Sequence, residues 1–372
     1  MRRWYVAAIL TTFHGLLLFV ALNLVAWAIL RAFPADPVTL TYGTRPYALV
    51  YPGRSLPEIR ELLRETWTRP VTWEPFTESR ERHFSGRFVN VHRSGFRLSS
   101  GQGPWPVDPS RANVFVFGGS TTFGYGVADD ETVVSALQRF LDQRLGSGRV
   151  ACYNFGRGAY YSTGERILFE ELLTTHDVPG VAVFIDGLNE FALAGPFPGS
   201  TLHSAVNFPV RGALTALADQ LPATRLIARW KNVRRPRAPD AAVAEAYDDP
   251  ALLDGRIERY LANRRIIAAS AAAWGVRTLF VWQPVPTYKY DLRYHLIGDL
   301  DFGANNYARF GYARMAARLA GDAGTGDLLW AADLQEGARA PLYVDQVHYT
   351  AAMCTLLAEE VGRALLARGI LR

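Results

Sequence analysis

Residues 113–122 read NVFVFGGSTT, and this stretch decides the fold. A short apolar run of valine and phenylalanine that ends in glycine predicts a strand buried on both faces, as in parallel sheets covered by helices. The glycines permit a sharp turn, after which Ser120 stands at the start of a helix. Ligands bind beyond the carboxyl ends of the strands in such sheets, so Ser120 is the first candidate functional residue.

Short apolar runs alternate with helical stretches over the rest of the chain. This alternation predicts an α/β fold, a three-layer α/β/α sandwich with a parallel, flavodoxin-like sheet, preceded by one N-terminal transmembrane helix. The further strands are predicted at residues 150–155, 181–186, 278–284 and 327–334, and the helices at residues 131–145, 164–174, 255–274, 305–319 and 351–367.

The predicted membrane helix is a long stretch without charged residues, from Trp4 to Leu30. At about 1.5 Å per residue it is longer than the ~30 Å hydrocarbon core of a bilayer. A cleaved signal peptide is the alternative, but its apolar core is shorter, about 7 to 15 residues. Arg2 and Arg3 favour a cytoplasmic N-terminus and a single pass through a bacterial inner membrane, with the catalytic domain on the periplasmic side. Within the stretch, Asn23 either pairs with another helix or is a tolerated polar residue.

Composition divides the chain into three parts. Residues 1–33 are predicted to be a cytoplasmic stub and membrane anchor, and residues 34–110, rich in proline, arginine and aromatics, a connector with a helix at Leu56–Thr66. Residues 111–372 are the α/β domain. Inside that domain the alternation breaks down at about residues 191–250, so this insert is either a lid over the strand ends or a docking surface.

The charge and cysteine content narrow the possible functions. The net charge of +5 arises from arginines scattered along the chain, and no basic stripe interleaved with aromatics appears, which argues against nucleic-acid binding. Cys152 and Cys354 are too few for a disulfide scaffold and lack the spacing of a zinc site. Two buried free thiols are the favoured interpretation, with a single bridge as the alternative.

Three further strand ends carry polar residues or glycines. Residues 154–159 form a loop that contains Gly158, and Asn189 follows the third strand. Asp345 and His348 lie immediately before the last helix. Three residues of separation let the carboxylate reach the imidazole, select its tautomer and stabilise the imidazolium. Each signal alone has an ordinary explanation as a turn or a surface histidine, and the order in which they follow the strands gives them their weight.

These blocks together resemble the SGNH hydrolases, also called GDSL-like esterases, of the membrane-anchored bacterial type. FGGST at residues 117–121 resembles the nucleophile block of that family, with Gly119 at the place of the family's aspartate. DGLNE at residues 186–190 resembles the asparagine block, and DQVHYT at residues 345–350 the histidine block. The family's oxyanion glycine falls at Ala159, next to Gly158.

The resemblance implies a hydrolase with a catalytic triad. Such an enzyme needs no metal or organic cofactor. Ser120 is the expected nucleophile, His348 its general base, and Asp345 the residue that orients the imidazole. The oxyanion donors that the resemblance implies are the N–H of Ser120, the N–H of Gly158 or Ala159, and the amide of Asn189.

Three functions remain open from the sequence. The first is an extracytoplasmic esterase that removes acetyl or other short acyl groups from an envelope carbohydrate or lipid. The second is an O-acyltransferase that modifies an envelope polysaccharide, with an integral membrane protein as acyl donor. The third is a non-catalytic scaffold of an envelope complex. Aromatic residues near the strand ends, among them Tyr160, Tyr161 and Trp282, either stack on sugar rings or pack in the core.

Overall fold

A computed structural model provides the structure of the chain. Its described residues form parts of two units, one of Thr44–Gly199 with Pro236–Arg372 and a smaller one of Met1–Gly43 with Ser200–Arg235. The residues that the structure describes are 2–33, 47–74, 76–192, 218, 220–231, 239–296, 301–320 and 326–371.

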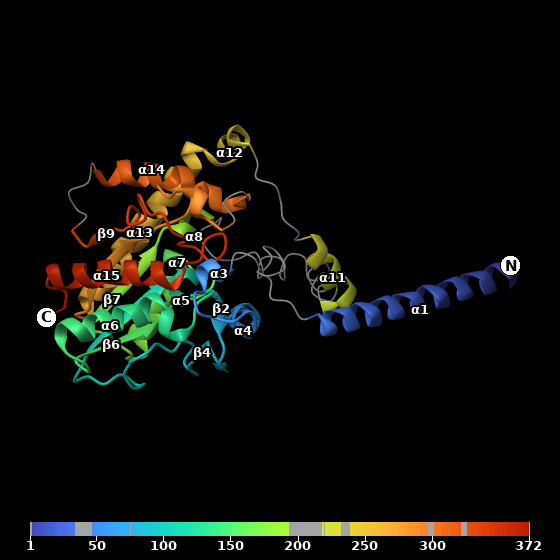
Figure 1. Cartoon of the computed structure of the whole chain (residues 1–372), viewed down its shortest axis with the longest axis horizontal. Helices are drawn as coiled ribbons and strands as arrows, with labels where there is room; N and C mark the ends of the chain where they lie inside the picture. The colour runs from blue at the N-terminus through green and yellow to red at the C-terminus, as the bar shows by residue number, and fades with distance from the viewer. Residues whose placement is uncertain are drawn as a thin grey trace. The chain divides into compact units, whose positions relative to one another are not determined.

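A five-stranded parallel sheet lies at the centre of the larger unit (Figure 1). Its strands lie in the order β6-β5-β7-β8-β9. Numbered along the chain this is the flavodoxin-like order 2-1-3-4-5, so the predicted α/β class and sheet type are confirmed. The strands are β5 (Ala112–Gly118), β6 (Val150–Asn154), β7 (Val181–Asp186), β8 (Arg277–Trp282) and β9 (Leu328–Trp330).

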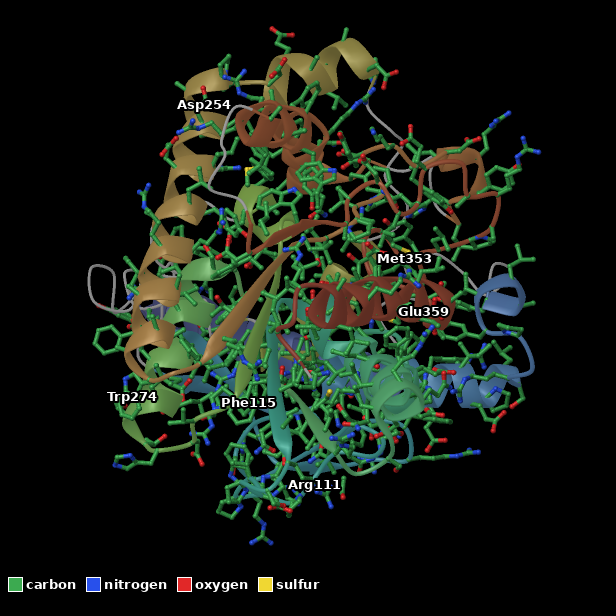
Figure 2. All side chains as sticks on the ribbon, turned by 90° about the vertical axis from the view of Figure 1, so that its left-hand side faces the viewer. Arg111, Phe115, Asp254, Trp274, Met353 and Glu359 are labelled. Atoms are coloured by element: carbon green, nitrogen blue, oxygen red, sulfur yellow. The ribbon has the colours of Figure 1, made fainter. Side chains whose placement is uncertain are left out.

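Helices cover both faces of this sheet because side chains alternate along each buried strand. Val114 and Val116 belong to the core cluster shared with α6 (Val133–Leu145) and α15 (Ala351–Ala367). Phe115 and Phe117 belong to the cluster on the opposite face. Figure 2 shows α13 and α15 on opposite sides of the strands. The helices that contribute to the second cluster are α7 (Ser162–Thr174), α8 (Leu188–Ala192), α13 (Pro250–Ala273) and α14 (Asn306–Ala320).

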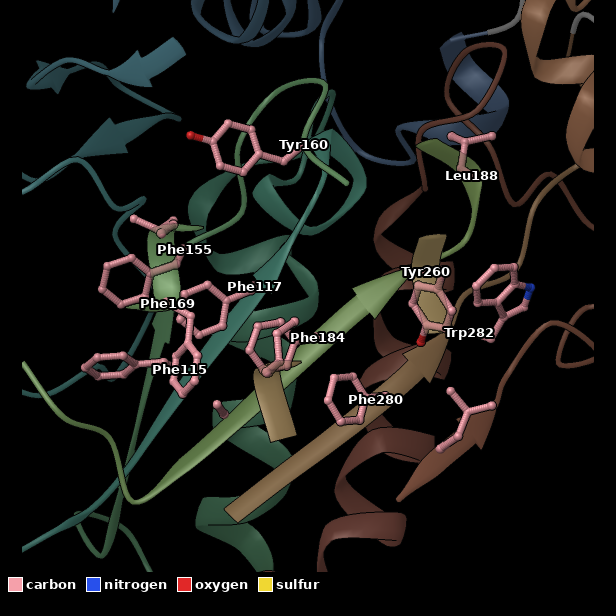
Figure 3. Close-up of a cluster of buried hydrophobic side chains, with 14 of the residues drawn as sticks. Phe115, Phe117, Phe155, Tyr160, Phe169, Phe184, Leu188, Tyr260, Phe280 and Trp282 are labelled. Atoms are coloured by element: carbon pink, nitrogen blue, oxygen red, sulfur yellow. The ribbon is translucent and has the colours of Figure 1, made fainter. Parts of the chain in front are cut away.

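The second cluster is built from aromatic rings that run across the strands (Figure 3). Phe184 stacks on Phe117 at 4.8 Å between ring centroids and on Phe280 at 5.4 Å. Trp282 is fully buried against Tyr260, with centroids 4.8 Å apart. Removing one such ring typically costs about 3–5 kcal/mol of stability. The aromatic residues near the strand ends, Tyr160, Tyr161 and Trp282, are therefore core residues and not sugar-stacking platforms.

Residues 47–110, predicted as a connector, belong to the same unit as the sheet. The predicted helix begins after Ser55, whose backbone N–H donates to Glu58 in a capping arrangement. Arg97 is fully buried and donates to the carbonyls of Phe123 and Gly124. The segment therefore supports the turn that carries Ser120. Its elements are α3 (Tyr47–Val50), α4 (Leu56–Thr68), β1 (Val71–Glu74), β2 (Glu78–Glu81), β3 (Phe84–Ser85) and β4 (Asn90–Val91).

The smaller unit contains α1 (Arg2–Ala32) and α11 (Pro222–Lys231). α1 is long and apolar enough to cross a membrane, and a signal sequence has the same character. Of the predicted insert, residues 193–217, 219 and 232–238 lie outside the described residues, while α12 (Asp240–Tyr247) belongs to the larger unit. Cys152 and Cys354 are buried free thiols, which confirms the favoured interpretation.

Candidate active site

Ser120 lies at the carboxyl edge of the sheet, directly after β5 and at the start of the short helix α5 (Ser120–Phe123). The turn before it requires glycine. A Cβ on Gly118 would lie 2.1 Å from Oγ1 of Thr122. Gly124 ends the short helix with φ 92°, a left-handed conformation that favours glycine. The chain thus turns tightly twice, and the Ser120 side chain remains partly accessible.

His348 contacts both other members of the predicted triad. Its Nε2 lies 2.8 Å from Oγ of Ser120, although the two residues are 228 positions apart in the chain. Its Nδ1 lies 2.7 Å from Oδ2 of Asp345. The structure therefore brings the three residues together in the order serine, histidine, aspartate. With Asp345 accepting from Nδ1–H, the neutral imidazole presents Nε2 as acceptor to the serine hydroxyl.

Asp345 is buried, yet it is held in its charged form. Burial raises its pKa, but the interaction with His348 and three hydrogen bonds outweigh this effect and lower the pKa overall. The backbone N–H groups of Val347 and His348 donate to Oδ1 at 3.0 and 2.9 Å. The carboxylate is therefore an acceptor for the imidazole at neutral pH, as the stabilisation of an imidazolium requires.

The predicted oxyanion donors surround the same turn. Asn189 lies on α8, directly after β7, and one N–H of its amide donates to the carbonyl of Tyr160 at 2.6 Å. A Cβ on Gly119 would lie 2.5 Å from this amide nitrogen, which explains why glycine occupies this place. The amide carries a second N–H, so it can donate to a substrate while keeping its position.

The loop of Gly158 approaches from the neighbouring strand β6. Its Arg157 N–H donates to the carbonyl of Gly118 at 3.0 Å, which joins the loop to the nucleophile turn. Ala159 has φ 60°, a conformation in which glycine is more usual. Within the described part of the chain, the N–H groups of Ser120, Gly158 and Ala159 donate to no acceptor. Gly158 and Ala159 both stay candidates for the second backbone donor.

Two aromatic residues that the sequence did not single out hold the imidazole. The ring of Tyr125 stacks on His348 with centroids 5.1 Å apart and planes 17° apart. Trp67 packs edge to face against His348 at 5.5 Å. Tyr125 follows the nucleophile turn between two glycines, which was the one available signal. Trp67 comes from the segment predicted as a connector, where no local pattern marks a site residue.

A buried ion pair between Arg69 and Glu81 contacts the hydroxyl of Tyr125. Arg69 donates to the Tyr125 hydroxyl at 2.7 Å and to both carboxylate oxygens of Glu81, at 2.6 and 2.7 Å. Its guanidinium also lies over the Phe123 ring, 3.9 Å from the centroid. Burial raises the pKa of the Tyr125 phenol, which keeps it neutral. Arg69, which follows α4, and Glu81, which ends β2, thereby hold the ring that contacts His348.

Three buried carboxyl groups lie close to Asn189 in the fold. Asp186 ends β7, Glu190 follows Asn189 on α8, and Glu165 lies on α7. Glu190 accepts the Ser162 N–H at 2.6 Å and pairs with Arg259 at 3.4 Å. Among the described residues no N–H or hydroxyl group donates to Glu165, and its carboxyl meets that of Asp186 instead. Burial and the neighbouring carboxyls raise the pKa values of Glu165 and Asp186 well above their usual range. These two groups therefore retain a proton between them.

Gln283, which follows β8, contacts the residue next to Ser120. Its Oε1 accepts the Thr121 hydroxyl at 2.8 Å, and its carbonyl accepts the hydroxyl of Tyr312 at 2.9 Å. Gln283 is buried, so it supports the helix that follows Ser120.

Comparisons with known proteins place similar chains among ester hydrolases. No family model and no curated protein matches the chain. Among solved structures, a lipolytic protein of the G-D-S-L family from Desulfitobacterium hafniense is 13% identical, with 68% of this chain and 100% of that chain covered and a TM-score of 0.36. A lipase from a goat rumen metagenome (13% identity, 68% and 96% covered, TM-score 0.40) and an acetylxylan esterase from Geobacillus stearothermophilus (13%, 69% and 94%, 0.37) are also similar.

Proposed function

We propose that the chain is a membrane-anchored serine esterase acting on acyl esters, most simply acetyl esters, of an envelope carbohydrate or lipid. One observation carries the proposal: the continuous hydrogen-bonded chain from Ser120 through His348 to Asp345. A buried ionised carboxylate, a single imidazole tautomer and an accessible hydroxyl are what a serine nucleophile requires.

The reaction begins when Oγ of Ser120 attacks the ester carbonyl carbon while Nε2 of His348 takes the hydroxyl proton. The carbonyl oxygen becomes an oxyanion, which the amide of Asn189 and backbone N–H groups of the two loops stabilise. Each such donor typically contributes about 3–4 kcal/mol to the lowering of the barrier. The imidazolium then protonates the departing alcohol, which leaves an acyl ester on Ser120.

Water completes the hydrolysis, with water as the nucleophile and Ser120 as the leaving group. His348 takes a proton from the water, the hydroxide attacks the acyl carbonyl, and Ser120 leaves with the proton returned by the imidazolium. If a sugar hydroxyl replaces the water, the same residues perform acyl transfer. No step of this proposal uses a metal or an organic cofactor.

In this proposal the apolar helix α1 holds the esterase at a membrane. Arg2 and Arg3 before the apolar helix support an N-terminus in the cytoplasm of a bacterium and a catalytic unit on the outer side of the inner membrane. An acylated envelope carbohydrate or lipid is then the accessible substrate. An integral membrane protein as acyl donor belongs to the transferase alternative.

The test uses the full chain in detergent with p-nitrophenyl acetate as substrate. Ser120→Ala should lower kcat by about 10⁴-fold or more, because no other residue replaces the nucleophile. Ser110→Ala, at an exposed serine outside the site, is the matched control and should retain full activity. Equal turnover by Ser120→Ala and the unchanged chain would refute the nucleophile, and inactivity of the unchanged chain on a panel of acyl esters would favour a scaffold.

Adding an acetylated or free polysaccharide separates hydrolysis from transfer. Release of acetate that is independent of the free polysaccharide supports the esterase. Acyl-polysaccharide formation that exceeds hydrolysis would assign the transferase function to the same triad.

A further inference from the structure

One face of the apolar helix α1 is covered, and the rest is exposed. From Arg3 to Phe33, the side chains that are not exposed are those of Asn23, Ala26 and Leu30. Their spacing places them on one face of a helix. The helix α11 packs alongside α1 within this unit (Figure 1). A segment of the insert thus contacts the predicted anchor, about 200 residues further along the chain.

Asn23 makes a specific hydrogen bond in this contact. Its Oδ1 accepts the backbone N–H of Ala223 at 3.2 Å, and its Nδ2 donates to the carbonyl of Phe19 at 2.9 Å. The first N–H groups of a helix have no partner within the helix, and leaving one unsatisfied in hydrocarbon costs several kcal/mol. The contact therefore explains why an asparagine occupies an otherwise apolar span. The contact also agrees with a helix α11 that begins within the membrane boundary.

The sequence of α11, PATRLIARWK, is amphipathic and basic. Its apolar residues Ala223, Leu226, Ile227 and Trp230 repeat at helical spacing, whereas Arg225, Arg229 and Lys231 stand between them, and the helix contains no acid. The side chain of Ile227 is 53% exposed, so the contact with α1 leaves apolar surface uncovered. An apolar stripe with a cationic face is typical of helices that lie in a membrane interface.

The depth of the contact agrees with this interpretation. Asn23 precedes Arg31, the charged residue that closes the span, by about 12 Å along the helix axis. Interfacial helices bury their apolar face about 5–10 Å into the boundary between headgroups and acyl chains. A helix that begins beside Asn23 starts close to this depth.

We propose that α11 is an interfacial helix that docks on α1 and binds the surface of a bilayer that contains anionic phospholipids. α11 is then a second segment of the chain, after α1, that contacts the membrane. It is the docking surface for lipid. This inference concerns the membrane contact alone and does not depend on the proposed esterase activity.

The test measures membrane depth at two labelled positions in the full chain. The full chain is reconstituted in phosphatidylcholine vesicles that contain phosphatidylglycerol, with a nitroxide on Ile227→Cys or, as control, on Leu356→Cys. Leu356 is 42% exposed on α15 of the larger unit. Burial raises the pKa of both native thiols, Cys152 and Cys354, so they do not compete for the label. Collision rates with oxygen and with a water-soluble nickel chelate report lipid and water contact.

The label at residue 227 should give an oxygen-to-nickel ratio severalfold above that at residue 356. Replacing Arg225, Arg229 and Lys231 together by glutamine should lower the ratio toward that of the control, as should vesicles of phosphatidylcholine alone. A label at residue 227 that is as open to the nickel chelate as the control would overturn the proposal. Protection that is unchanged in the triple variant and without phosphatidylglycerol would overturn the assignment to anionic lipid.

Discussion

Asp345 and the pair Glu165–Asp186 are buried carboxyl groups whose pKa values are shifted in opposite directions. Asp345 receives two backbone N–H groups and the imidazole N–H, and its pKa is lowered. Glu165 and Asp186 lie against one another, no described cation pairs with either, and their pKa values are raised. Burial alone therefore does not decide whether a carboxyl is ionised in this protein; the donors around it do.

The largest expected effect comes from replacing the ionised group. In Asp345→Asn the amide oxygen must accept the two backbone N–H groups, so the amide N–H₂ turns toward Nδ1 of His348 and forces the proton onto Nε2. That tautomer cannot accept from Ser120. We expect kcat on p-nitrophenyl acetate to fall by about 10⁴-fold with the fold retained. Asp130→Asn, at an exposed position, is the control, and a loss below tenfold would contradict the role of Asp345.

A buried carboxyl group can also be paired with a cation, as Glu81 is with Arg69. In Arg69→Met the Glu81 charge stays buried without its partner, and we expect a loss of about 3–5 kcal/mol in the free energy of unfolding in urea. The double variant Arg69→Met, Glu81→Gln should regain most of it. Arg87→Met breaks the exposed pair with Glu58 and should cost much less, because solvent screens exposed ion pairs. Equal losses at the two sites would remove the distinction between them.

The protonated pair predicts a stability that depends on pH. Because the pKa of Glu165 is raised on folding, the unfolded chain loses this proton first, and the free energy of unfolding falls as pH rises above the unfolded value near 4.5. Glu165→Gln keeps the neutral form at every pH. We expect it to be more stable than the unchanged chain from neutral pH upward, by about 1–3 kcal/mol, and to show no advantage near pH 4.

Thermal unfolding at a series of pH values measures this difference. Glu171→Gln lies on the same helix at an exposed position and should show no pH-dependent gain. A Glu165→Gln advantage that is independent of pH would mean that the gain comes from packing and not from the proton.

The smallest expected effect comes from the stacking of the Tyr125 ring on His348. Tyr125→Leu removes the stacked ring, and we expect kcat to fall by up to about tenfold, because aromatic pairs typically contribute about 0.5–1.5 kcal/mol beyond their buried area. Tyr125→Phe keeps the ring and loses only the hydroxyl that Arg69 contacts. Its kcat should stay nearer to that of the unchanged chain. A larger loss in Tyr125→Phe than in Tyr125→Leu would assign the effect to the hydroxyl.

The sequence by itself determined the order of strands and helices, the parallel sheet and the candidate site residues. These rest on local patterns: runs of valine and phenylalanine, the glycines before Ser120, and the three-residue spacing of Asp345 and His348. The helix predicted at residues 351–367 coincides with α15, because an apolar periodicity and the Thr350 cap lie within the segment itself. Ser120, Gly158 and Asn189 follow strand ends, and parallel strands end at one edge of the sheet, whereas Asp345 and His348 precede α15.

Only the tertiary structure decided which distant segments meet. It places Nε2 of His348 against Ser120, brings Trp67 and Arg69 from the presumed connector to the imidazole and its neighbour, and joins Asn23 to Ala223. It also leaves Glu165 and Asp186 facing each other, which no spacing in the sequence indicates. Such contacts depend on how helices pack on the sheet and on each other, and that packing is set by side chains far apart in the chain.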